Sequence, residues 1–178
     1  MIETRSARGE PTTPQAGRLG GIARRPAPRA TMEVIARGLV TPERGLEGDH
    51  KGPKFPRRQV TLLATEAWAA AIATLDDLAG PVPLPWTTRR ANLLVEGVRL
   101  PRGHGSLLRV GPVLLEVTAQ TYPCRRMEQA HPGLMKALAA DWRGGITTRV
   151  VEGGTLAIGD AVTIERVVAQ PPDPRLPD

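Results

Sequence analysis

The chain has few cysteines, few aromatic residues and no long apolar run. A single Cys among 178 residues excludes an intrachain disulfide and any zinc finger built on several cysteines. No stretch approaches the ~20 apolar residues of a bilayer-spanning helix, so we expect no membrane association. Residues 1–30 also lack the apolar segment of a secretory signal. With 40% hydrophobic and 24% charged residues, the composition is that of a soluble globular protein, for which we expect a cytoplasmic location.

The net charge of +6 raises the question of a nucleic-acid partner. Residues 1–30 alone contain six Arg and two Glu, so most of the excess lies near the start of the chain. The sequence has no recognition helix and only five aromatic residues, without a stacking pattern. We therefore expect no nucleic-acid partner.

Short strands dominate the pattern of hydrophobic residues and turns. Only two or three helices are predicted, among them 65–75 (opened by Thr65 as N-cap) and 134–140, and they do not alternate with the strands. This order favours a mostly β fold, a distorted and partly closed antiparallel β-barrel with a few short helices. We expect one such domain over residues 17–168, a flexible leader at 1–16 and a Pro-rich tail at 169–178. The predicted strands are 17–25, 32–40, 59–64, 92–98, 107–110, 113–119, 146–151 and 161–168.

Cys124 is the residue with the most evident chemistry. It follows Pro123 at a strand end, and Arg125 and Arg126 come directly after it. Adjacent guanidinium groups favour the thiolate, which is both a nucleophile and a soft metal ligand. The alternative is a small buried residue without special reactivity.

Histidines and acidic residues offer weaker alternatives. Any of His50, His104 and His131 could approach Cys124 for Cys–His catalysis, but no spacing selects one of them. A zinc site would need three or four ligands, and Asp49–His50 with His104 or Asp160 is only a weak candidate.

Arginine pairs lie beside several predicted strand ends. Arg presents a planar fork of donors that suits phosphate or carboxylate, so converging pairs would form a pocket for an anionic ligand. Surface charge is the alternative for any one pair. A Gly-rich loop over residues 41–57 would permit close backbone approach, although it is not a P-loop. The pairs are Arg57–Arg58, Arg89–Arg90 and Arg125–Arg126.

Taken together, these segments resemble the MOSC domain, named after the C-terminal domain of molybdenum cofactor sulfurases. The resemblance extends over about residues 17–168 and rests on the order and spacing of several short motifs. These are GLEGD at 45–49, RQVTLL at 58–63, RRANLLVEG at 89–97, LLRVG at 107–111, PCRRM at 123–127, PGL at 132–134, RGG at 143–145, GG at 153–154 and IGDAV at 158–162.

The resemblance implies a molybdenum cofactor (molybdopterin) and a role for each matching residue. Cys124 would ligate molybdenum or receive sulfur, and Asp49 would act in catalysis or fix its loop. PLP is not expected on this chain itself, because no lysine-bearing motif for it is visible. The residues expected to bind the cofactor are Arg58, Arg89, Arg90, Asn92 and Arg125.

Two functions follow from the resemblance. The chain would bind the molybdenum cofactor and reduce N-hydroxylated substrates, with electrons from separate electron-transfer proteins. Alternatively, it would be a non-catalytic sulfur carrier with a persulfide on Cys124, loaded by a cysteine desulfurase in trans.

Overall fold

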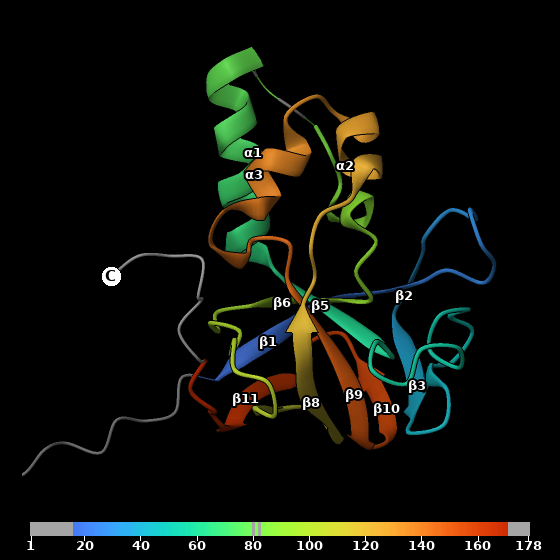
Figure 1. Ribbon diagram of the computed structural model, residues 1–178. Coiled ribbons are helices and arrows are strands. Elements are labelled where there is room, and N and C mark those ends of the chain that lie inside the picture. The colour runs from blue at the N-terminus through green and yellow to red at the C-terminus, as the bar shows by residue number, and fades with distance from the viewer. Residues whose placement is uncertain (1–15, 80, 82, 171–178) are drawn as a thin grey trace, which may run out of the picture.

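The computed structural model describes residues 16–79, 81 and 83–170, which form a closed β-barrel with helices gathered at one end (Figure 1). The barrel strands are hydrogen-bonded in the order β11–β7–β8–β9–β5–β6–β1, and β1 pairs with β11 to close the ring. The predicted fold class is confirmed, and the barrel is closed rather than partly closed. Its seven strands are β1 (Gly17–Arg24), β5 (Val60–Ala64), β6 (Leu93–Glu96), β7 (Leu107–Val110), β8 (Val113–Gln120), β9 (Ile146–Glu152) and β11 (Ala161–Arg166).

One neighbouring pair of strands departs from the antiparallel arrangement. β5 and β6 are parallel, with Leu62 opposite Leu93 and Ala64 opposite Val95. Parallel neighbours need a crossover connection, which here contains helix α1 (Thr65–Ala79) and the short 3-10 helix η1 (Trp86–Arg89). This crossover places Arg89 and Arg90 immediately before β6.

The barrel interior is an apolar core formed by the inward faces of its strands. Leu19, Leu62, Leu93, Leu108 and Leu115 are almost completely buried there. Alternation along each strand produces this face, as in β6, where Leu93 and Val95 are buried and their neighbours are half-buried. The core gives the strand ends rigid positions, and the site described below lies at such ends.

The segment 32–40, predicted as one strand, is two strands in different sheets. β2 (Glu33–Ile35) pairs with β1, whereas β3 (Arg37–Thr41) joins a three-stranded sheet with β4 (Gly45–Leu46) and β10 (Gly154–Ala157). The prediction was wrong because it took Val34 as an inward residue, whereas its side chain is exposed. Two more strands lie where other elements were predicted. β4 lies within the predicted loop 41–57, and β10 starts within the predicted turn 153–154.

Three helices form a second core above the barrel. α1 packs against α3 (Leu134–Ala139), and α2 (Arg125–Ala130) packs beside α3 (Figure 1). Trp68 and Leu75 of α1 meet Met127, Leu134 and Leu138 in this core. The burial of Met127 anchors α2, the helix that directly follows Cys124. A second 3-10 helix, η2 (Ala140–Trp142), leads from α3 toward β9.

Two further predictions concern the ends of elements. Thr65 is the first residue of α1, but its buried hydroxyl makes no hydrogen bond with the described residues, so the predicted N-cap role is wrong. The predicted leader and tail lie almost entirely outside the described residues. Within the described part of the chain, no helix is long and apolar enough to cross a membrane.

Candidate functional site

Cys124 lies at the junction between the barrel and the helical layer. Strand β8 ends at Gln120, and Cys124 precedes the first turn of α2, where its carbonyl accepts a hydrogen bond from Met127 N at 2.8 Å. Its backbone is extended, with φ −114° and ψ 172°, as the residue after a proline and before a helix can adopt without strain. The thiol is free and exposed.

The thiol opens into a cavity of about 430 Å³ that is strongly cationic. Of the described residues that line it, none is Asp or Glu. Seven basic side chains contribute to its wall, from the end of β1, the Gly-rich loop, the crossover before β6 and the start of α2. They are Arg25, Arg29, Lys51, Arg58, Arg89, Arg90 and Arg126.

Arg89 is one of the two buried cations of this wall, with Arg25. Its Nε donates to Gly144 O at 2.9 Å and its Nη2 donates to Thr121 O at 3.0 Å. Burial lowers the pKa of Arg89 to about 10, while the nearby Cys124 raises it and Arg58 lowers it. Arg89 therefore remains charged at neutral pH, and it joins the segments before Cys124 and before β9.

The lowered pKa values of Lys51 and Arg90 show that the cations of the cavity wall lie close enough to repel one another. Burial lowers the pKa of Lys51, with Arg58 as the next cause, and Cys124 acts in the opposite direction. Burial also lowers the pKa of Arg90, with Arg126 as the next cause. Arg90 has a left-handed backbone, φ 65°, which lets η1 end and the chain enter β6 beside the cavity. Mutual repulsion among these cations favours an anionic ligand.

The hydroxyl group of Thr121, at the cavity, has no hydrogen-bond partner among the residues that the structure describes. Thr121 is 7% exposed and lines the cavity, and its Oγ1 is buried without a hydrogen bond to the described residues. A buried hydroxyl without a partner is costly, so this atom fits a site where a bound ligand provides the missing hydrogen bond.

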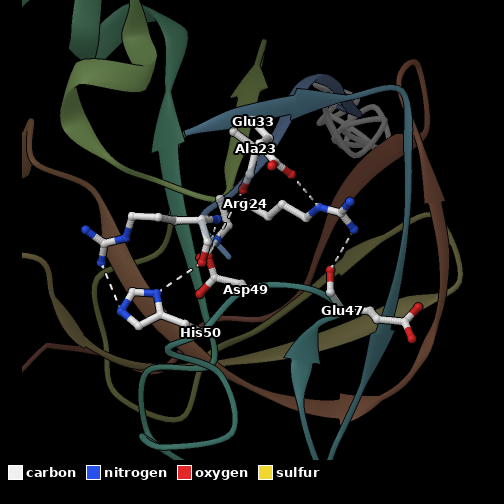
Figure 2. A network of polar contacts seen from close by, with 8 residues as sticks. Ala23, Arg24, Glu33, Glu47, Asp49 and His50 are labelled. Carbon is white, nitrogen blue, oxygen red and sulfur yellow. Dashed lines mark hydrogen bonds and ion pairs between the residues drawn. The ribbon is translucent and has the colours of Figure 1, made fainter. Parts of the chain in front are cut away.

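Asp49 belongs to a buried network next to the cavity wall (Figure 2), and it accepts a hydrogen bond from the buried Asn92. Asp49 Oδ2 accepts from Arg25 N at 3.0 Å and from Asn92 Nδ2 at 3.1 Å, and Oδ1 accepts from Lys51 N at 3.0 Å. Asn92 Nδ2 also donates to Ala23 O, and its Oδ1 accepts from the backbone and hydroxyl of Thr61. The network ties the Gly-rich loop to β1, β5 and the start of β6, so it holds Arg25 and Lys51 in the wall.

The histidines have separate surroundings. His50 lines the cavity, but its Nδ1 lies 3.1 Å from Arg25 O and its Nε2 lies 3.4 Å from Arg25 Nη2. Its ring therefore orients Arg25. His104 contacts Arg57, and His131 contacts the carbonyl of Pro132. In the described part of the chain, no three His, Cys, Asp or Glu side chains form a group that could hold a metal ion by themselves.

The structure brings most of the predicted site residues together. Arg58, Arg89, Arg90 and Cys124 share the cavity, and Asp49 and Asn92 support it from behind. Arg125 is exposed and does not line the cavity; its neighbour Arg126 does. Sequence reasoning missed the contributions of Arg25 and Arg29 because it assigned their charge to the basic start of the chain. No local pattern marked them, because Arg25 is the last residue of the predicted strand 17–25 and Arg29 lies in the loop that follows it.

These features define a class of protein: a closed, mostly antiparallel barrel with one exposed thiol in a cationic cavity. The sequence profile of the MOSC domain matches residues 47–163, more than half of the chain, and the chain belongs to this family. Among curated proteins, no sequence matches the chain significantly.

Solved structures share the fold. The YuaD protein of Bacillus subtilis superposes with a TM-score of 0.70 at 16% identity, over 88% of this chain and 99% of that one. YiiM from Escherichia coli gives 0.62 at 17% identity, over 86% and 72% of the two chains. YiiM from Geobacillus stearothermophilus gives 0.63 at 16% identity, over 83% and 74%. At these identities the likeness concerns the fold alone.

Proposed function

We propose that the chain binds a molybdenum cofactor, with the Cys124 thiolate as a metal ligand, and reduces N-hydroxylated substrates. Membership of the MOSC family associates the chain with this cofactor in general. The observation that carries the proposal is the exposed thiol of Cys124 inside a cavity whose charged lining residues are all basic. A soft thiolate suits molybdenum, and clustered guanidinium groups suit the phosphate of the pterin.

The residues present fit such a group. The cavity volume of about 430 Å³ is within the usual range of ligand sites. The unpartnered hydroxyl of Thr121 would hydrogen-bond the ligand, and Arg58 and Arg90 would hold its phosphate. A neighbouring, more open groove of about 610 Å³ shares Arg29, Arg90, Arg126 and Met127 with this cavity, and substrate would approach through it.

Each protein group has a definite task in the proposed reaction. When bound, the cofactor supplies two-electron redox chemistry; with two protons, the N–OH group becomes N–H and water. Cys124 would ligate the molybdenum, and Arg89 keeps the segment before Cys124 in place through its hydrogen bond to Thr121 O. Electrons would come from separate electron-transfer proteins. The exposed Tyr122 lies at the rim, where an aromatic ring can cover a planar substrate.

Metal and pterin content tests this proposal. Wild-type protein purified from a host that makes the cofactor should contain about one molybdenum per chain and release a fluorescent oxidised pterin. Cys124→Ser should lose the metal, and Arg58→Gln with Arg90→Gln should lose the pterin. Arg109→Gln, which removes two ion pairs made from β7 to Glu152 and Glu165, is the matched control and should retain both. Folded wild-type protein without molybdenum would contradict the proposal.

The exposure of Cys124 also favours a second candidate, a sulfur carrier for cofactor maturation. The Cys124 thiolate would attack the terminal sulfur of a desulfurase persulfide and release the desulfurase thiolate, so that one sulfur atom moves and no net oxidation occurs. Mass spectrometry after incubation with a cysteine desulfurase and cysteine should show one added sulfur. Equal loading of Cys124→Ser would exclude this function.

A further inference from the structure

A second cavity, of about 480 Å³, lies on the other side of the segment that joins η2 to β9. Gly144 of this segment lines the Cys124 cavity, whereas Trp142, Arg143 and Gly145 line the second one. None of the residues discussed for the cofactor site lines it. We propose that this second cavity binds a small monocarboxylate with an apolar, preferably aromatic, body.

The inner wall of the second cavity is apolar. Ala67 and Ala70 on the first turns of α1 leave space next to Val98, Leu100 and Ile146, residues that lie at or beyond barrel strand ends. These small alanine side chains and the larger aliphatic ones together line the apolar part of the cavity, which we call the slot. An apolar body that displaces water from this slot gains the free energy of burying hydrocarbon.

Cationic groups gather at the rim of the slot. Arg102 donates to the Asp141 carboxylate, and this hydrogen bond is the main cause that lowers the pKa of Asp141; Arg99 and Arg143 lower it further. Glu66 accepts from Gly97 N at 2.7 Å. Among the described residues, Arg99 and Arg143 form no ion pair. Arg143 Nη1 donates to Thr74 Oγ1 and Ala137 O, so Arg99 and the other N–H groups of Arg143 are available to an incoming carboxylate.

The backbone at Asp141 and Trp142 is strained in a way that shapes this slot. Both residues are left-handed, with φ 45° and φ 59°, a conformation that non-glycine residues rarely adopt. The turn places the indole of Trp142 on the cavity wall, with the guanidinium of Arg102 at 5.7 Å from the ring. Backbone strain of this kind gathers at functional sites. Because Arg102 lies over this ring, a ligand ring would pack against the indole together with the guanidinium, and both surfaces suit an aromatic body.

Charge and shape together favour one ligand class. A neutral apolar ligand would make no use of Arg99 and Arg143, and an inorganic anion would leave the alanine wall wet. A ligand with one carboxylate and a ring satisfies both parts. The inference does not depend on what Cys124 binds, so the two proposals succeed or fail separately.

Isothermal titration of the full chain with 4-phenylbutyrate tests the inference, with sulfate in excess to occupy the Cys124 cavity. The carboxylate should bind at least about tenfold more tightly than 4-phenylbutyramide, its neutral analogue, and more tightly than acetate, which lacks the ring. Arg99→Gln and Arg143→Gln should each weaken binding severalfold, whereas Arg109→Gln should not.

Two substitutions keep the test independent of charge. Ala67→Phe would fill the slot and should abolish binding while the protein remains folded by circular dichroism. Binding by Cys124→Ser should match the wild type, because Cys124 lies in the other cavity. Equal affinity for the amide and the acid, or binding that Ala67→Phe leaves intact, would overturn the inference, as would the absence of binding at millimolar concentration.

Discussion

The buried guanidinium of Arg89 bonds to the main-chain carbonyl of Thr121 across 3.0 Å, three residues before Cys124. The same side chain reaches Gly144 O at 2.9 Å. One residue of the crossover before β6 thus holds two neighbouring segments that line the cationic cavity. The relationship explains why a charge is tolerated at a position that is only 6% exposed: it has fixed acceptors on two sides.

Replacement of Arg89 tests this arrangement. Arg89→Met removes both hydrogen bonds and leaves two buried carbonyls without a donor, so we expect the free energy of unfolding to fall by about 2 kcal/mol. Urea denaturation measures the change. The matched control is Arg58→Gln, an exposed cation of the same cavity, whose stability should stay within about 0.5 kcal/mol of the wild type. Equal stability of the two variants would contradict the structural role of Arg89.

Asp49 offers a test of a role that the sequence left open. Its two carboxylate oxygens accept three hydrogen bonds, two of them from the backbone of Arg25 and Lys51. Asp49→Asn replaces one oxygen by a donor, which then faces a donor, and we expect a loss of about 1–3 kcal/mol in stability. Glu43→Gln, on an exposed residue of the loop, is the control. A variant that is fully stable but inactive would favour the catalytic role instead.

How far the sequence predicted this molecule depends on the range of the interactions involved. The barrel class followed from local alternation and turns. Cys124 and the arginine pairs followed from the chemistry of adjacent residues, and the MOSC resemblance gave them a common role. The division of 32–40 into two strands could not be predicted from local alternation, because Val34 alternates like a core residue but lies on an exposed face. The contribution of Arg25 to the cavity depends on the pairing of β1 within the closed barrel, a long-range contact that no local pattern reports.

The segment between the two cavities depends on glycine at position 145. Gly145 has φ +89°, and a Cβ there would lie 2.1 Å from Leu62 O. Gly145→Ala combines backbone strain with a clash against main chain, so we expect a loss of more than about 3 kcal/mol. Gly159, with φ +96° and open space where a Cβ would lie, is the matched control, and Gly159→Ala should cost only about 1 kcal/mol. Thermal and urea unfolding compare them, and similar losses in both variants would show that the clash is relieved.

The lowered pKa values predict how anion binding changes with pH. Sulfate keeps its charge throughout the alkaline range, so any change in its affinity reports on the protein. Burial lowers the pKa of Lys51, and that of Arg89 to about 10, so both lose their protons below the pH at which ordinary lysine and arginine do. Loss of positive charge weakens anion binding; the affinity should therefore fall severalfold between about pH 8 and pH 10.5.

Two variants separate the two groups in that titration. Lys51→Met and Arg89→Met should each remove part of the fall, and the part that Arg89→Met removes should be centred near pH 10. The pH dependence of stability has the opposite sign to the pH dependence of anion affinity. Since the folded pKa of Arg89 is below the unfolded value, the unfolded chain holds this proton up to higher pH, and the contribution of Arg89 to stability rises with pH above about 10. An affinity that stays constant up to pH 10.5 in the wild type would show that neither cation contacts the anion.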